Sequence, residues 1–236
     1  MMGGHRYLRA LALGLGLTFS LGLLSACAPV LIGGAATTTA VVAVDRRTTG
    51  EQVEDKAIDL KAGNETRLLL EDKPGRINVH SYAGRVLLTG DVPTAEDKDR
   101  AGQKVAGVDK VVQVINRLRV GEPTELSVRS NDTWITTKAL SSLINTKGVP
   151  TRTMSVTTER GVVYLQGRVT PEEGERAAKV VAGIPGVNEV VKLFEYISPE
   201  DLKEDGTIKD EFAEKSKGKG TSGPQRVEPE ALPVKN

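Results

Sequence analysis

Hydrophobic and polar side chains alternate in two matching segments of the chain, residues 77–92 and 154–169. The segments are displaced by a constant 77 positions, and six aligned pairs are identical: Val79/Val156, Gly84/Gly161, Val86/Val163, Leu88/Leu165, Gly90/Gly167 and Val92/Val169. These identities fall mostly on alternate positions, which is the spacing of one face of a β-strand, and a shared glycine marks a turn. The chain therefore contains a duplicated module built on a pair of strands.

In the second copy the pattern predicts a helix ahead of the strands. Asp132 is expected to cap this helix, which ends near Asn145. An apolar stripe on one of its faces is expected to meet the core, formed by Ile135, Ala139, Leu140 and Leu143.

Strands are expected at 153–158 and 162–169, joined by a turn at Arg160-Gly161, where glycine tolerates a positive φ. A second helix follows, with Thr170 and Glu173 in the positions of a capping box. Residues 187–197 supply a last strand.

The first copy repeats this order, with elements expected at 51–64, 76–82, 85–92, 94–105 and 108–120. Its first helix is expected to be the weaker, because Gly63, Glu65, Thr66 and Arg67 occupy the region where the second copy has leucine and isoleucine. The pattern thus predicts an α+β class with two tandem modules, 47–121 and 126–197. Each has the order helix-strand-strand-helix-strand, a small sheet packed by two helices.

The first 26 residues have the pattern of a signal peptide, with a basic start, an apolar run over 10–24 and small residues before Cys27. The Leu-Ser-Ala-Cys sequence that ends at Cys27 resembles the lipobox of bacterial lipoproteins. That resemblance implies that Cys27 is acylated and becomes the new N-terminus. The alternative is an ordinary secretory signal followed by a thiol without a role.

Residues 27–46 are expected to form an acylated tether between the membrane and the first module. More than one acyl chain on Cys27 would give stable attachment without a membrane span. Ala28 stands where an aspartate would resemble an inner-membrane retention signal, which favours the outer membrane with the protein facing the periplasm.

Charge and composition argue against several functions. Without Arg6 and Arg9 of the signal peptide, 30 basic and 31 acidic side chains remain, so no basic field favours nucleic acid. His80 is the only histidine after the signal peptide, and no His/Cys cluster has metal-ligand spacing. We therefore expect no metal, no cofactor and no catalytic activity.

The element order, the phrase G-x-V-x-L-x-G-x-V and the Gly-Val pairs at 107–108 and 186–187 resemble the BON domain. Two copies behind a lipobox, with SNDTWITTK at 130–138, resemble more narrowly the outer-membrane lipoproteins of that family. The resemblance covers residues 27–197. It implies binding of anionic phospholipids through the first helix of the second domain, with a role in envelope integrity and localisation at the division site. It also admits outer-membrane or division-site proteins as partners.

Five residues of that helix are expected to face outward, because at about 100° per residue they lie away from the core stripe. They are Trp134, Thr137, Lys138, Ser141 and Ile144. Tryptophan suits a membrane interface and a nearby lysine can reach a lipid phosphate. Alternatively, Trp134 packs between the modules or against residues 120–126. In a different class of function, the protein is an adaptor or structural protein that binds another envelope protein or peptidoglycan.

Residues 198–236 mix acidic and basic side chains with glycine and proline and lack apolar periodicity. This composition predicts a disordered or at most transiently helical tail. The alternative is a short partner-binding motif at residues 208–212.

Overall fold

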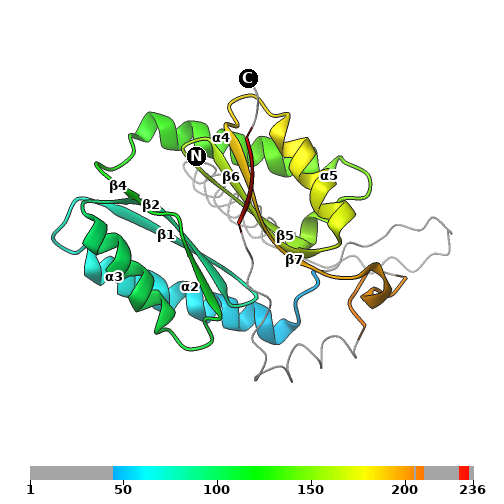
Figure 1. Cartoon of the computed structure of the whole chain (residues 1–236), viewed down its shortest axis with the longest axis horizontal. Helices are drawn as coiled ribbons and strands as arrows, with labels where there is room; N and C mark the ends of the chain where they lie inside the picture. The colour runs from blue at the N-terminus through cyan, green and yellow to red at the C-terminus, as the bar shows by residue number, and fades with distance from the viewer. Residues whose placement is uncertain (1–44, 205, 210–228, 234–236) are drawn as a thin grey trace, which may run out of the picture. The chain divides into compact units, whose positions relative to one another are not determined.

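Two four-stranded sheets, each with a pair of helices on one face, account for most of the computed structural model (Figure 1). The structure describes residues 45–204, 206–209 and 229–233. The signal peptide, Cys27 and most of the expected tether lie outside these ranges. All described residues belong to one compact unit of the chain.

The first domain contains α2 (Thr49–Leu69), β1 (Arg76–Tyr82), β2 (Arg85–Val92), α3 (Ala95–Ala106), β3 (Gln113–Asn116) and β4 (Arg119–Val120). The second contains α4 (Leu126–Ile144), η1 (Thr151–Thr153), β5 (Met154–Glu159), β6 (Val162–Val169), α5 (Pro171–Ala182), β7 (Glu189–Tyr196), η2 (Pro199–Asp201) and β8 (Glu230–Pro233). The predicted α+β class and the order helix-strand-strand-helix-strand are confirmed.

The two hairpins have the same register. Val79 pairs with Leu88 in the antiparallel β1–β2 ladder, and Val156 pairs with Leu165 in the β5–β6 ladder. The next strand then runs parallel, β3 beside β2 and β7 beside β6. Each hairpin turns through two residues with positive φ, at Ala83-Gly84 and at Arg160-Gly161. These turns match the right-handed twist of the strands, and the predicted turn at 160–161 is confirmed.

The helix α2 does not end near Asn64 as expected but continues to Leu69. Its buried side chains keep helical spacing past Gly63, through Ala62, Thr66 and Leu69. The Thr66 hydroxyl donates to the Ala62 carbonyl oxygen at 2.9 Å, which lets this polar residue lie buried in the helix. Burial of this stripe therefore outweighs the low helix propensity of Gly63.

The expectation that Asp132 caps α4 is wrong, because α4 starts at Leu126 and Asp132 lies inside it. The buried Asp132 carboxylate instead accepts hydrogen bonds from the backbone N–H groups of Arg160 and Gly161, at 2.7 and 2.8 Å. Leu140 was also misplaced, since its side chain is 37% exposed while the rest of the expected stripe is buried.

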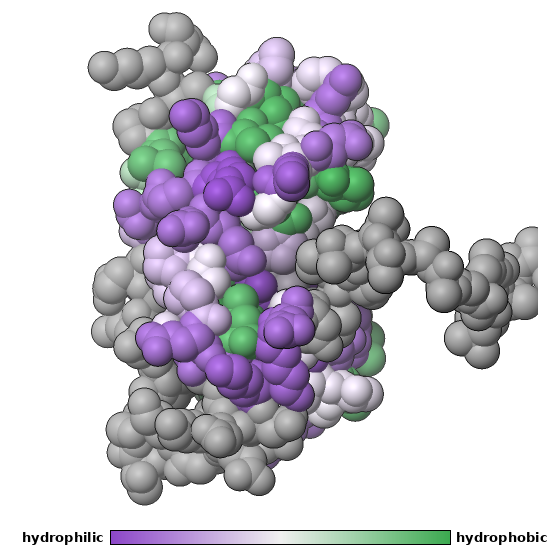
Figure 2. All heavy atoms as spheres, turned by 90° about the vertical axis from the view of Figure 1, so that its right-hand side faces the viewer, coloured by the Kyte–Doolittle hydropathy of each residue, from purple (hydrophilic) through white to green (hydrophobic). Residues whose placement is uncertain are grey.

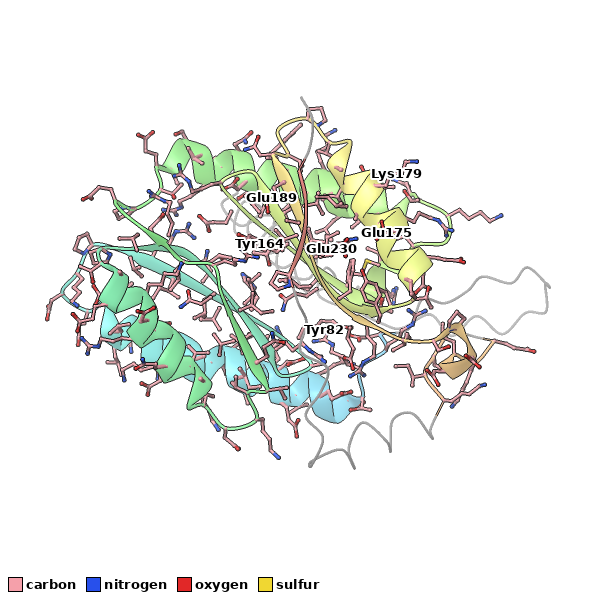
Figure 3. All side chains as sticks on the ribbon, viewed as in Figure 1. Tyr82, Tyr164, Glu175, Lys179, Glu189 and Glu230 are labelled. Carbon is pink, nitrogen blue, oxygen red and sulfur yellow. The ribbon has the colours of Figure 1, made fainter. Side chains whose placement is uncertain are left out.

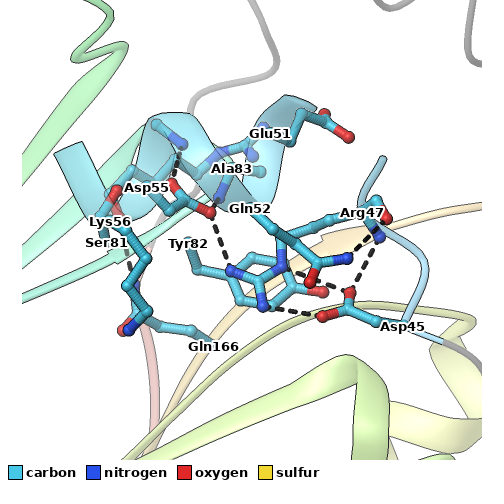
Figure 4. Close-up of polar contacts among 12 residues, drawn as sticks. Asp45, Arg47, Glu51, Gln52, Asp55, Lys56, Ser81, Tyr82, Ala83 and Gln166 are labelled. Carbon is cyan, nitrogen blue, oxygen red and sulfur yellow. Dashed lines mark hydrogen bonds and ion pairs between the residues drawn. The ribbon is translucent and has the colours of Figure 1, made fainter. Parts of the chain in front are cut away.

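In the first domain the residue equivalent to Asp132 is Asp55, 77 positions earlier, and it binds the hairpin turn in the same way. Its carboxylate accepts from the N–H groups of Ala83 and Gly84 and from the Ser81 hydroxyl. Arg47 donates to Asp55 and lies over the Tyr82 ring, 4.2 Å from its centroid (Figure 4). A buried helical aspartate thus binds the hairpin turn in both domains.

The last strand of the first domain is broken, whereas residues 108–120 were expected to form one strand. β3 ends at Asn116 and β4 begins at Arg119. Between them the Asn116 side chain accepts from the Leu118 N–H at 3.2 Å, and Leu118 is buried in the core. The corresponding strand of the second domain, β7, runs unbroken over eight residues.

The two sheets contact each other through the faces that the helices leave uncovered. Five buried side chains from both domains form this seam: Leu87, Ile115, Tyr164, Val191 and Leu193. Figure 3 shows Tyr164 pointing into the space between the sheets. The duplicated modules therefore bury both faces of their sheets.

Polar contacts in the seam are reciprocal. The Tyr82 hydroxyl donates to the Thr153 carbonyl oxygen at 2.7 Å, and Arg76 forms an ion pair with Glu159. Glu159 is 77 positions after Tyr82, and Thr153 is 77 positions after Arg76. Equivalent positions therefore meet with their roles exchanged, which is the pattern of a two-fold interface.

The end of the expected tether is fixed to the second domain. Arg46 is 5% exposed, and its guanidinium donates to both carboxylate oxygens of Glu173, at 2.7 and 2.9 Å, and to the Arg168 carbonyl oxygen. Arg168 in turn pairs with Glu51 and Glu195. Residues 45 and 46 are therefore not part of a free tether, because buried ion pairs hold Arg46 in place.

The expectation of a disordered tail is wrong for its last described residues. Glu230–Pro233 forms β8, which pairs antiparallel with β7. Leu202 and Ile208 form an isolated antiparallel bridge. Residues 210–228, with most of the expected partner motif, lie outside the described ranges.

Candidate functional site

The five outward residues expected on α4 are all exposed. Trp134 is 46% exposed and Ile144 is 68% exposed, near the two ends of this surface. The Lys138 ammonium lies 5.6 Å from the centroid of the Trp134 ring, within the range of a cation–π contact. The helix thus brings Trp134 and Lys138 together at the surface, and we call the exposed side of α4 the Trp134 face.

The opposite side of α4 holds the helix in place. Ile135, Ala139 and Leu143 are fully buried in the core of the second domain, with α5 and the β5–β6 hairpin. Asp132 adds the bonds to the hairpin turn described above. The Trp134 face is therefore presented by a helix that is fixed to the core between Asp132 and Leu143.

Three residues of this face were not among those expected from the sequence. Leu126 is 68% exposed, Leu140 is 37% exposed, and Arg129 is exposed as well. Leu126 lies 18 residues before Ile144, which is five turns of an α-helix, so the two share one side. The helical period could have shown this, had the helix start at Leu126 been recognised.

The threonine hydroxyls of the Trp134 face are satisfied within the helix. Thr137 donates to the Thr133 carbonyl oxygen at 2.9 Å, and Thr133 donates to the Arg129 carbonyl oxygen at 3.0 Å. Because these donors already have partners, less free energy is lost when the face leaves water. The face can therefore enter a less polar environment.

Charge separates this face from the corresponding helix of the first domain. Between Leu126 and Ile144 the single acidic residue is the buried Asp132, while Arg129 and Lys138 are exposed. Helix α2 carries Glu51, Glu54, Asp59 and Glu65 around its exposed Val53, Leu60 and Leu68. Both helices expose apolar side chains, but only α4 does so without an exposed carboxylate.

The described residues offer little for other chemistry. They contain no group of three or more His, Cys, Asp or Glu residues placed to hold a metal ion. Burial lowers the pKa of His80, and the charged groups that act on it are Asp59 and Lys56 of α2. In the part of the chain that the structure covers, no helix is long and apolar enough to cross a membrane. Figure 2 shows one side of the molecule with separate hydrophobic patches in a mostly hydrophilic surface.

Comparison with known proteins identifies the module. The family model of the BON domain matches residues 64–122 and 131–198. The chain is 38% identical over 191 residues to the outer membrane lipoprotein DolP of Haemophilus influenzae, covering 80% of this chain and 97% of that protein. It is 36% identical to the 21 kDa hemolysin of Actinobacillus pleuropneumoniae, over 65% of this chain and 80% of that protein. It is 30% identical to the osmotically-inducible protein Y of Escherichia coli, over 60% of this chain and 72% of that protein.

Proposed function

This chain belongs to the BON-domain family, and we propose that it is a non-enzymatic outer-membrane lipoprotein that binds anionic phospholipids through the Trp134 face of α4. The name of the relative in Haemophilus influenzae supports the membrane and the lipoprotein class. We extend the proposal to a role in envelope integrity, including at the division site, as the family resemblance implies.

Acylation of Cys27 supplies most of the membrane affinity in this proposal. Two or more acyl chains give stable attachment, whereas each lysine or arginine near an anionic surface contributes about 1 kcal/mol. The two exposed cations of the helix, Arg129 and Lys138, therefore select among lipids rather than hold the protein on the membrane. Attachment through Cys27 makes this weak second contact effective, because it raises the local concentration of lipid.

The observation that carries the proposal is the pairing of Trp134 and Lys138 on a helix side without an exposed carboxylate. A tryptophan ring enters the interfacial region while its N–H stays hydrated, and an ammonium group beside it reaches the phosphate. Leu126, Leu140 and Ile144 add apolar area on the same side. An exposed acidic residue there would be repelled by an anionic headgroup, and none is present between residues 126 and 144.

Vesicle binding tests the proposal. The mature chain with Cys27→Ser is mixed with vesicles of phosphatidylglycerol or of phosphatidylcholine, and the bound fraction is measured by sedimentation. We expect binding to phosphatidylglycerol alone, and a loss of about tenfold in affinity, or about 1.4 kcal/mol, for Trp134→Glu. Leu60→Glu is the matched control, because it places the same charge at an exposed apolar position of α2.

Equal losses for Trp134→Glu and Leu60→Glu would contradict a specific role for α4, as would unchanged binding of Trp134→Glu. The adaptor function predicts a different result, since Trp134 would then be a hot spot for a protein partner. In that case the unlipidated chain binds neither vesicle and associates with membranes only when envelope proteins or peptidoglycan are present.

A further inference from the structure

The outer edge of β7 is covered by a strand that comes from far along the chain. β8 pairs with β7 so that Glu230 lies opposite Lys192 and Leu232 lies opposite Val190. The side chains of Glu230 and Leu232 point to the helix-covered side of the sheet, because alternate residues of a strand share a face. The intervening Ala231 lies opposite Val191 and carries only a methyl group.

Lys192 is the centre of this contact. It is 2% exposed, and its ammonium donates to Glu175 of α5 and pairs with Glu230 of β8 at 2.9 Å. Figure 3 shows Glu175 and Glu230 close together. Burial by itself would lower the pKa of Lys192, but the two carboxylates outweigh it and raise that pKa above its usual value. A buried ammonium needs such partners, so the edge of β7 favours an incoming acidic residue.

Leu232 supplies the apolar part of the contact. It is partly buried and packs against the core cluster that includes Val190 and Phe194. An incoming strand therefore meets a charged position at Lys192 and, two residues on, an apolar position at Val190. The pattern it must present is an acidic residue, any small residue and then an apolar residue.

Several features make β8 a weak occupant of this edge. It has four residues and ends at Pro233, which has no N–H to donate to a ladder. Glu230 remains 61% exposed in its side chain, so water competes for its ion pair. β7 is twice as long and its other edge is fully paired with β6, from Val162↔Glu189 to Val169↔Tyr196.

From this arrangement we propose that the outer edge of β7 is a docking site for an extended peptide of another protein, and that β8 occupies the site in cis until such a peptide displaces it. The peptide adds a strand to the sheet, places a glutamate or aspartate against Lys192 and inserts an apolar side chain beside Val190. Backbone hydrogen bonds supply affinity in this mode of recognition, and the two side-chain positions supply specificity. This proposal does not rest on lipid binding by α4.

Competition between the tail and a free peptide tests the proposal. The probe is a fluorescent peptide of residues 227–236, and its anisotropy is measured with three forms of the mature Cys27→Ser chain. These are the full chain, a chain that ends at residue 228, and a full-length chain with Glu230→Lys and Leu232→Asp. The third form keeps the chain length, so it tests the site even if the shortened chain does not fold.

We expect both altered chains to bind the probe at least about tenfold more tightly than the full chain, because the tethered β8 competes at high effective concentration. Probes with lysine in place of Glu230, or aspartate in place of Leu232, should bind at least about tenfold more weakly than the unaltered probe. In hydrogen exchange, the amides of β7 that face β8 should exchange faster in the altered chains and slow again with the probe, whereas those that face β6 should change less.

Two results would overturn the proposal. One is that no form of the chain binds the probe while circular dichroism shows the full-length variant folded. The other is equal binding of the unaltered and altered probes, which would show that the edge does not select an acidic and an apolar position.

Discussion

Trp134 and Ile144 of α4 stand where the first domain has Ala57 and Arg67, although the hairpins beneath the two helices are superimposable in register. Of the buried side chains that hold each helix, Asp55, Ile58 and Ala62 of α2 recur as Asp132, Ile135 and Ala139 of α4, whereas Thr66 stands opposite Leu143. Duplication has thus kept the contacts that fix a helix to its sheet and changed the side that faces away from it. In this protein an outward helix face is the part that is free to acquire a function.

The sheet edges differ in the same way. The first domain ends its sheet with the short, interrupted β3 and β4, and the second with the eight-residue β7. A long unpaired edge is a template for unwanted pairing, so β7 requires a cover that the broken edge does not. The difference shows why a tail strand appears beside the second domain.

Among equivalent positions of the two domains, the largest difference in the stability lost on substitution is expected at Gly90 and Gly167. Gly90 has φ +116, and a Cβ there would lie 2.0 Å from the Arg76 carbonyl oxygen. At Gly167 the corresponding Cβ would lie 2.7 Å from the Thr153 carbonyl oxygen, without a positive φ. We expect Gly90→Ala to lower the free energy of unfolding by about 4 kcal/mol and Gly167→Ala by about 2 kcal/mol, as measured in urea. Equal losses would show that the two strands relax alike.

A smaller difference in lost stability is expected between the two aspartates that bind the hairpin turns, Asp55 and Asp132. Asp55 accepts from two backbone N–H groups, a serine hydroxyl and Arg47, whereas Asp132 accepts from two backbone N–H groups. Asp55→Ala should therefore cost about 3 kcal/mol and Asp132→Ala about 2 kcal/mol of unfolding free energy. The reverse order, in the same urea experiment, would mean that the extra partners of Asp55 contribute nothing.

In the seam we expect Tyr82→Phe to lower the free energy of unfolding by about 1 kcal/mol more than Tyr164→Phe does. The Tyr82 hydroxyl donates to Thr153 and accepts from the Arg168 N–H, so Tyr82→Phe removes contacts between the domains. Tyr164→Phe is the control, because its ring lies in the seam but its hydroxyl has no hydrogen bond to any described residue. Thermal unfolding should show a lower midpoint for the first variant alone; a similar shift in both would contradict a role for the hydroxyl.

The smallest effect is a pH dependence of opposite sign at Glu51 and Glu159. Burial raises the pKa of Glu159 despite the nearby Arg76, so the folded state holds this proton more tightly than the unfolded state. Its contribution to stability therefore falls as pH rises from the usual carboxyl pKa to the raised one. For Glu51, burial would also raise the pKa, but Arg168 outweighs it and the pKa is lowered. Its contribution is therefore present above the usual carboxyl pKa and lost as pH falls.

Unfolding in urea across the acidic range checks these signs with Glu159→Gln and Glu51→Gln. Relative to the unaltered chain, Glu159→Gln should gain stability as pH rises and Glu51→Gln should lose it. Parallel curves for the two variants would refute the assignment.

The strands and their turns could be predicted because alternation and positive-φ glycines are local properties of the sequence. The capping box of α5 is another local signal: Thr170 and Glu173 bond each other's backbone as expected. The outward side of α4 followed from the helical period, and its exposure agrees with that expectation. Lipid contact at this side remains a prediction.

Other features depend on contacts that a local pattern does not contain. Asp132 has the residue type of an N-cap, and only its equivalence to Asp55 at the 77-residue offset could have indicated a shared role in the turns. Arg46 is a single basic residue in sequence, and its burial depends on Glu173, 127 positions away. The pairing of β8 with β7 likewise joins segments separated by a long stretch of chain, and its four residues carry no distinct pattern.

The contact of Arg46 with the second domain also determines where a pull on the chain is applied. Tension along the segment that leads to Cys27 reaches Glu173 of the second domain through Arg46, and also Asp55 of α2 through the contacts of Arg47 with Asp45 and Asp55. Fully extended, the 17 residues between Cys27 and Asp45 span at most about 60 Å. With Cys27 acylated, both domains would therefore stay close to the bilayer, because the ion pairs of Arg46 and Arg47 fix the point at which the segment joins them.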